Sequence, residues 1–241
     1  MAAKKVAPKR AAKVKPTAKA AAKTAEAAPE LKIDVGCGKN KREGFVGFDQ
    51  LTFDAVDAKV QLAGRHWNIL SVYNNRIKLP TVVKTVVGPD GKPRKYTTLV
   101  DNCVDEVHCS HFLEHLTNFN DKWERVHFFN ELWRVMKPDA KCTMIIPHWA
   151  SSRYYGDPSH KEPFSEMGWF YLDPAWRAVN APHVDVSQGI DYACNFFVTY
   201  GYGIQPELQP KPQEHQMYAL KYYKEAAQDM IATLVKKPMP E

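Results

Sequence analysis

Two acidic residues and a glycine-containing loop near residue 35 have the types and spacing of a nucleoside site. Asp34 lies in a short apolar run, 31–35, that ends on Gly36 and Gly38. Glycines directly after a buried strand permit positive φ angles and let a ligand lie close to the backbone. Asp49 ends the next apolar run, where its carboxylate can accept hydrogen bonds from both hydroxyls of a ribose. The two runs therefore predict a nucleoside site at the carboxyl edge of a sheet.

A second polar group follows the apolar run 104–109, which predicts another core strand. Ser110 and His111 come directly after this run, so we expect them at the same edge of the sheet as the glycine loop. Three histidines, His108, His111 and His115, stand close together in the sequence. Because His108 and His111 point to opposite faces of a strand, a shared metal is not expected, and the sequence predicts no metal site.

The segment after the next predicted strand is both polar and aromatic, and we expect it to form a substrate lid over 148–180. Its candidate substrate contacts are His148, Tyr154, Asp157 and His160. An aspartate three residues before a histidine suits a hydrogen-bonded pair that fixes the imidazole tautomer. His160 and His111 are therefore the candidate catalytic bases. A lid held together by its own hydrogen bonds is the alternative interpretation.

The elements that must position these residues begin with the two strands around the glycine loop. Only six residues separate Gly38 from Phe45, whereas a parallel crossover with a helix needs a dozen or more. The connection between the first two strands is therefore predicted to be a loop or a single turn. A third strand is expected within 55–62, and the alternating β-branched residues of 81–99 predict an inserted β-hairpin.

The second half of the chain contains further periodic stretches. Apolar residues at spacings of three and four predict a helix over 119–136, and 142–146 predicts a strand that ends at Pro147. The alternation in 192–204 predicts a final hairpin or a pair of edge strands. Residues 213–235 are expected to form a helix that caps the sheet or packs against another copy.

The first 30 residues differ in composition from the remainder. They contain 12 alanines, 8 Lys or Arg residues and 2 acids, so they carry the whole net charge of +6 and leave the body formally neutral. With no aromatic residue to bury, 1–30 is expected to be a disordered basic tail. Such a tail can bind nucleic acid without sequence preference and with steep salt dependence, or it can serve only solubility.

The body of the chain, 31–241, has the length of one domain with a proper core. Its apolar runs fall short of the roughly 20 residues that a membrane helix requires. The five cysteines are widely spaced and form no Cys-x-x-Cys motif, which favours buried thiols in a reducing compartment. A cytoplasmic location is therefore expected.

The order of these features resembles the class I S-adenosylmethionine (SAM) methyltransferases over about 31–150. The resemblance rests on the acid, glycine loop and Asp49, on the run 101–116, and on Glu131–Ala140, where Asp139-Ala140 stands in place of Gly-Gly. It implies a three-layer, Rossmann-like α/β fold with a mostly parallel sheet, a C-terminal antiparallel hairpin and SAM as the cofactor. The residues that it assigns to SAM are Asp34, Gly36, Cys37, Gly38, Asp49, Ser110 and His111. The segment Asp157–Ser165 is similar to one in some phage and bacterial methyltransferase-like proteins.

Three functions are consistent with these observations. The resemblance favours a SAM-dependent methyltransferase whose acceptor is not identified. The second hypothesis is a catalytically inactive methyltransferase-like protein that its basic tail tethers to nucleic acid. The third hypothesis is an NAD-dependent enzyme, but Lys41 stands where a dinucleotide-binding loop has its third glycine.

Overall fold

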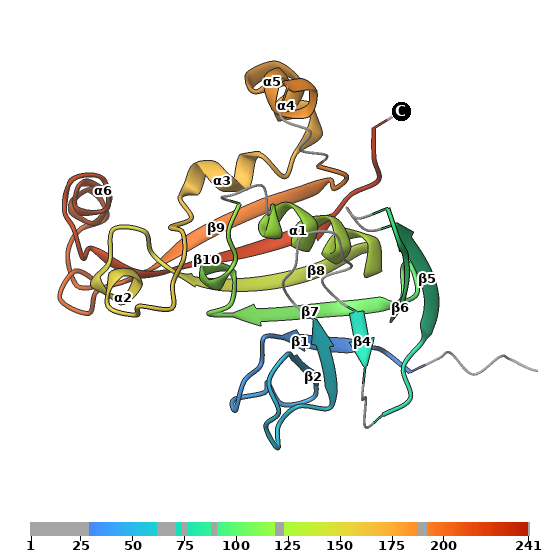
Figure 1. The fold of residues 1–241 in the computed structure, drawn as a ribbon. Helices are drawn as coiled ribbons and strands as arrows, with labels where there is room; N and C mark the ends of the chain where they lie inside the picture. The colour runs from blue at the N-terminus through green and yellow to red at the C-terminus, as the bar shows by residue number, and fades with distance from the viewer. Residues whose placement is uncertain are drawn as a thin grey trace, which may run out of the picture.

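The computed structural model describes residues 29–61, 71–73, 77–87, 91–118, 123–187 and 192–240. The tail prediction for 1–30 falls almost entirely outside these ranges. The described strands form one ten-stranded sheet in the order β5-β6-β4-β3-β2-β1-β7-β8-β10-β9 (Figure 1). No helix among the described residues is both long and apolar enough to cross a membrane.

The centre of the sheet is parallel and follows the doubly wound strand order. Its strands are β1 (Lys32–Val35), β2 (Val46–Asp49), β3 (Ala58–Gln61), β7 (Val104–Ser110) and β8 (Met136–Pro147). The chain runs outward from β1 through β2 to β3 and then returns to the other side of β1 with β7. The strand order thus reverses beside β1, and such a reversal places a crevice at the carboxyl ends of the strands.

Antiparallel strands extend this centre on both sides. At one edge lie β4 (Ser71–Tyr73), β5 (Thr81–Val87) and β6 (Pro93–Leu99), of which β5 and β6 pair along the predicted hairpin. At the other edge, β10 (Ala227–Lys236) runs antiparallel to both β8 and β9 (Phe196–Ile204). The Rossmann-like fold and its C-terminal antiparallel strand pair are therefore confirmed.

Seven short helical elements connect the described strands. They are η1 (Leu113–His115), α1 (Glu124–Val135), α2 (Ser152–Tyr155), α3 (Glu166–Phe170), α4 (Pro174–Asn180), α5 (Pro182–Ser187) and α6 (Gln213–Tyr222). In Figure 1, α1 and α3 lie on the same side of the sheet, and α2 and α6 lie beyond the end toward which β7 points. Residues 36–45 contain no helix, as the short connection predicts.

Helices α1 and α3 cover one face of the sheet. Trp169 of α3 donates its indole N–H to the sulfur of Met230, and Lys236 places its ammonium 4.2 Å from the ring centre of Trp133 on α1. Met230 and Lys236 are an even number of residues apart on β10, so they point to the same face. On the opposite face Phe197 and Ile231 are 59% and 41% exposed.

Two predicted helices end earlier than expected. The helix predicted over 119–136 is α1, which begins at Glu124, and Met136 already belongs to β8; residues 119–122 lie outside the described ranges. The helix predicted over 213–235 is wrong beyond Tyr222, because Ala227–Lys236 forms β10 in the interior of the sheet. The hairpin predicted within 192–204 is instead the single strand β9, whose partner is β10.

Candidate active site

The glycine loop turns sharply at the end of β1 and closes onto β2. The amide N–H groups of Gly36 and Cys37 both donate to the carbonyl oxygen of Phe48, at 2.8 and 3.3 Å. Gly36 has a φ of +70°, and a Cβ added to it would lie 2.9 Å from Phe112. Only glycine fits this combination of positive φ and close packing. The loop backbone is therefore fixed with little side-chain bulk above it.

Asp34 and Cys37 support the loop from behind. One carboxylate oxygen of Asp34 accepts the Arg42 N–H at 2.7 Å, and the other lies 2.9 Å from Nδ1 of His108. Asp34 is 2% exposed, so its carboxylate fixes the loop and the histidine. The Cys37 thiol is buried, and burial together with the nearby Asp34 and Asp49 raises its pKa to about 12. Cys37 is therefore a neutral thiol rather than a nucleophile.

Asp49 stands at the carboxyl end of β2 and faces the same loop. Its two oxygens accept the backbone N–H groups of Gly38 and Leu51, both at 2.8 Å. Each carboxylate oxygen has two lone pairs, so Asp49 can accept further hydrogen bonds from a ligand. Asp49 is 7% exposed, and the two backbone hydrogen bonds hold its carboxylate in one orientation.

A cavity of about 290 Å³ opens between this loop and the residues after β7. We call it the loop cavity; its lining residues are Gly36, Gly38, Asp49, Gln50, Leu51, Phe53, His111, Phe112, His115, Leu116 and Lys161. The structure thus brings together four of the seven residues that the sequence assigned to the cofactor, Gly36, Gly38, Asp49 and His111. Asp34, Cys37 and Ser110 do not line it. Sequence reasoning missed Phe53 and Lys161, which no motif marked.

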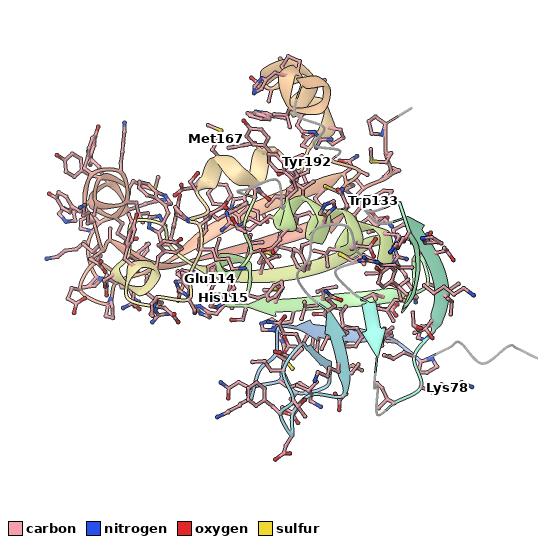
Figure 2. The ribbon with its side chains drawn as sticks, viewed as in Figure 1. Lys78, Glu114, His115, Trp133, Met167 and Tyr192 are labelled. Atoms are coloured by element: carbon pink, nitrogen blue, oxygen red, sulfur yellow. The ribbon has the colours of Figure 1, made fainter. Side chains whose placement is uncertain are left out.

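His111 lies at the exit of β7 with a φ of +52°, unusual for a residue other than glycine. Its Nδ1 is 3.5 Å from a carboxylate oxygen of Glu114, and its Nε2 is 3.9 Å from Asp229 on β10. The contact with Glu114 raises the pKa of His111, against the opposing effect of burial. Figure 2 shows Glu114 and His115 near the carboxyl end of β7.

His160 and Asp157 do not form the hydrogen-bonded pair that the sequence predicts. Their side chains are 3.8 Å apart, because Asp157 instead accepts hydrogen bonds from the N–H and the hydroxyl of Ser159. The side chain of His160 is 7% exposed, with its Nδ1 2.6 Å from the carbonyl oxygen of Tyr154. His160 lies beside the loop cavity without lining it, and Asp157 stabilises a surface turn.

His148 and Tyr154 likewise point inward. His148 is 3% exposed; its Nδ1 accepts the Ala150 N–H, so its Nε2 carries the proton that faces Glu166 at 3.2 Å. Tyr154 is buried, and its carbonyl oxygen orients His160. His148, Tyr154 and Asp157 thus contact other lid residues, as the alternative interpretation expects, and a contact of the lid with substrate stays a prediction.

Glu166 at the start of α3 connects three elements. It accepts hydrogen bonds from His148, from the Trp149 indole at 2.8 Å, and from the hydroxyl of Tyr202 on β9. Burial acts to raise the pKa of Glu166, but the hydrogen bonds from His148, the backbone and Trp149 lower it to about 2 from 4.5. The ionised carboxylate is thus part of the folded structure.

Replacing Glu166 with glutamine is expected to lower the free energy of unfolding near pH 7 by about 2–3 kcal/mol. Because the folded-state pKa is depressed, the contribution is complete above pH 4.5 and is lost as the pH falls toward 2. Urea unfolding of wild type and Glu166→Gln between pH 7 and pH 3 tests this, with the exposed Glu207→Gln as control. If the difference in unfolding free energy between wild type and Glu166→Gln does not become smaller below pH 4.5, the ionised Glu166 carboxylate is not the source of the stability.

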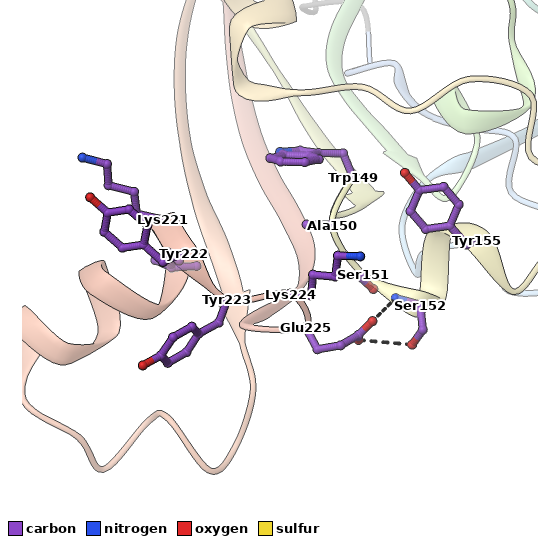
Figure 3. Close-up of a pocket in the computed structure, with 11 residues that line it drawn as sticks. Trp149, Ala150, Ser151, Ser152, Tyr155, Lys221, Tyr222, Tyr223, Lys224 and Glu225 are labelled. Atoms are coloured by element: carbon purple, nitrogen blue, oxygen red, sulfur yellow. Dashed lines mark hydrogen bonds between the residues drawn. The ribbon is translucent and has the colours of Figure 1, made fainter.

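A second cavity of about 470 Å³ lies beyond the carboxyl end of β8 (Figure 3). We call it the aromatic cavity; it is lined by Trp149, Ala150, Ser151, Ser152, Tyr155 and residues 220–225. Glu225 holds its two sides together by accepting hydrogen bonds from the N–H and hydroxyl of Ser152 (Figure 3). Asp229 on β10 lies between Arg153 and His111: one oxygen is 2.5 Å from Arg153 and the other 3.9 Å from His111.

These features define a Rossmann-like α/β protein with a glycine loop and a strand-end carboxylate around a cavity at the point where the strand order reverses. This is the fold that the resemblance to the class I methyltransferases implies.

No family model and no curated protein matches the chain. Among solved structures, a SAM-dependent methyltransferase from Archaeoglobus fulgidus is 17% identical, with 86% of each chain covered and a TM-score of 0.46. The 1,6-didemethyltoxoflavin-N1-methyltransferase of Burkholderia thailandensis, bound to 1,6-didemethyltoxoflavin and S-adenosylhomocysteine, is 11% identical; the match covers 87% of this chain and 72% of that one, with a TM-score of 0.41.

Proposed function

We propose that the protein is a SAM-dependent methyltransferase that binds SAM in the loop cavity. The observation that carries the proposal is the meeting of Gly36, Gly38 and Asp49 around one cavity at the carboxyl ends of β1 and β2. In a doubly wound sheet this is where nucleoside ligands bind. The bare backbone of the loop suits a closely held ligand, and Asp49 suits the ribose hydroxyls.

The residues around the loop cavity fit the parts of SAM. Phe53, Phe112 and Leu116 give apolar walls, while Asp49 and the loop backbone give polar contacts. Bound SAM supplies a methyl group on a sulfonium sulfur. Transfer breaks the methyl–sulfur bond, forms a bond from the methyl carbon to the acceptor and leaves the neutral thioether, and the acceptor loses a proton where it carries one. The protein contributes mainly by holding the two reactants in line and excluding water.

The aromatic cavity is the proposed acceptor site. It is larger than the loop cavity, and the aromatic side chains of Trp149, Tyr155, Tyr222 and Tyr223 can enclose an apolar ring or chain. Asp229 lies 3.9 Å from His111 of the loop cavity and 2.5 Å from Arg153, which follows Ser152 of the aromatic cavity, so we propose that a polar group of the acceptor is oriented there. Of the two candidate bases, His111 lines the loop cavity and lies 3.9 Å from Asp229, whereas His160 lines neither cavity. We therefore propose His111 as the residue that orients the acceptor.

The substitution His111→Asn tests this role, because asparagine tolerates the positive φ at this position. We expect methyl transfer at saturating SAM to fall about 10²–10⁴-fold, which is more than the loss of SAM affinity that follows from changing one side chain of the loop cavity. The assay incubates the full chain with SAM carrying an isotopically labelled methyl group and with fractionated small molecules, nucleic acids and proteins, and follows the label by mass spectrometry. If His111→Asn transfers the methyl group as fast as wild type, His111 does not orient the acceptor. If wild type binds SAM but labels no fraction, the inactive binding protein becomes the favoured hypothesis.

A further inference from the structure

The Glu114 side chain in η1 is 3% exposed, and neither of its carboxylate oxygens has a hydrogen-bond partner among the described residues. Burying an ionised carboxylate is costly unless it is paired or coordinates a metal. The His111 ring offers only a contact of 3.5 Å, longer than a hydrogen bond. Glu114 thus has unused acceptor capacity beneath the loop cavity.

Two further histidines surround the same carboxylate. Nε2 of His160 lies 3.8 Å from a Glu114 oxygen, and the ring of His115 lies 5.0 Å from that of His160. One ligand atom from each of Glu114, His115 and His160 lies within 4.8 Å of the others. Two ligands bound to one tetrahedral ion at 2.0–2.2 Å stand about 3.4 Å apart, so Glu114 and His160 need to approach by only about 0.4 Å.

Backbone carbonyl oxygens fix the orientation of both imidazoles. His160 donates its Nδ1 proton to the carbonyl oxygen of Tyr154 at 2.6 Å, which leaves Nε2 with its lone pair toward Glu114. Nδ1 of His115 lies 3.3 Å from the carbonyl oxygen of Ser159. Metal-bound histidines commonly donate their second ring N–H to a backbone carbonyl in this way.

We propose that Glu114, His115 and His160 bind a divalent transition-metal cation of the Zn²⁺ type. One carboxylate and two imidazoles are donors that suit Zn²⁺ and its neighbours, whereas Mg²⁺ and Ca²⁺ prefer oxygen ligands. The cation neutralises the buried Glu114 and joins η1 to the segment that contains His160. This site differs from the set His108, His111 and His115 considered from sequence, because His108 is bonded to Asp34 instead.

The metal site adjoins the loop cavity, because His115 lines that cavity as well. An acceptor with an oxygen donor would complete the coordination and be polarised beside the methyl group. This last consequence rests on the proposed function, whereas the metal site itself does not.

Calorimetric titration of the chelator-treated full chain with Zn²⁺, Mn²⁺ and Mg²⁺ tests the proposal. We expect one Zn²⁺ per chain, weaker binding of Mn²⁺ and no detectable binding of Mg²⁺. Glu114→Gln should weaken Zn²⁺ binding about 100-fold or more, and the exposed control His215→Ala should leave it unchanged. His115→Gln, at a half-buried position, gives the same test if Glu114→Gln does not fold.

The metal site would be overturned if Glu114→Gln and His115→Gln bound Zn²⁺ as tightly as wild type, or if the folded wild-type chain bound no Zn²⁺. Glu114 would then be an ion-pair partner of His111. SAM binding is measured on the same samples. SAM binding without Zn²⁺ binding refutes only the metal site, and Zn²⁺ binding without SAM binding refutes only the proposed function.

Discussion

Replacing Arg125 with methionine is expected to lower the free energy of unfolding by about 3–5 kcal/mol. The Arg125 guanidinium on α1 is 4% exposed and donates to the carbonyl oxygens of Leu113, Glu162 and Pro163. It thereby holds the segment after β7 against the lid. Methionine keeps most of the side-chain volume but removes the hydrogen bonds that the guanidinium donates to these carbonyl oxygens. It also removes the positive charge beside the buried Glu162 carboxylate, 3.8 Å away.

Urea unfolding of Arg125→Met, Glu162→Gln and the double variant measures this effect. Because part of the penalty comes from losing the positive charge beside the Glu162 carboxylate, the double variant should lose less stability than the sum of the single variants. Lys78→Met, at an exposed position, is the control and should change stability by less than about 0.5 kcal/mol. A loss below 1 kcal/mol for Arg125→Met would show that this contact does not hold the lid.

Replacing Asp49 with alanine is expected to weaken SAM binding by about 1–3 kcal/mol, or about 5- to 150-fold in Kd. Among the described residues that line the loop cavity, Asp49 is the acidic one, and its remaining lone pairs suit the ribose hydroxyls. The same change also removes the acceptor for the Gly38 and Leu51 N–H groups, so the loop itself loses support.

Two controls separate these contributions. Asp54→Ala removes an exposed carboxylate from the same stretch and should leave SAM affinity unchanged. Asp49→Asn keeps one acceptor oxygen, so its affinity for SAM should lie between those of wild type and Asp49→Ala. Unchanged affinity in Asp49→Ala would mean that the ribose is bound elsewhere.

The parallel centre of the sheet was predictable because local pattern and tertiary position agree there. Apolar runs such as 31–35 and 104–109 are short, and both become buried central strands. Strand β10 was not predictable in the same way. Its residues Met230 and Leu234 fit a helical spacing with Met217 and Leu220, yet Met230, Ala232 and Leu234 also alternate as a strand requires. Pairing with β8 and β9 on both sides decides between the two patterns.

The candidate site was predictable where its residues adjoin in sequence, and less so where distant segments meet. The loop cavity contains Gly36, Gly38 and Asp49 because two neighbouring strands end side by side. The burial of His160 depends on contacts with Glu114, many residues away, which no local pattern encodes. Glu114 was missed for the same reason, although its spacing from His111 and His115 in a single turn was a signal that could have marked it.

The measurement that tests the central claim most directly is calorimetric titration of the full chain with SAM. The account predicts saturable binding of one SAM per chain, competition by S-adenosylhomocysteine, and the stated loss of affinity in Asp49→Ala with none in Asp54→Ala. The absence of binding at millimolar SAM, with the chain shown to be folded by circular dichroism, would contradict it. The loop cavity would then not be a SAM site, and the inactive binding protein would become the better interpretation.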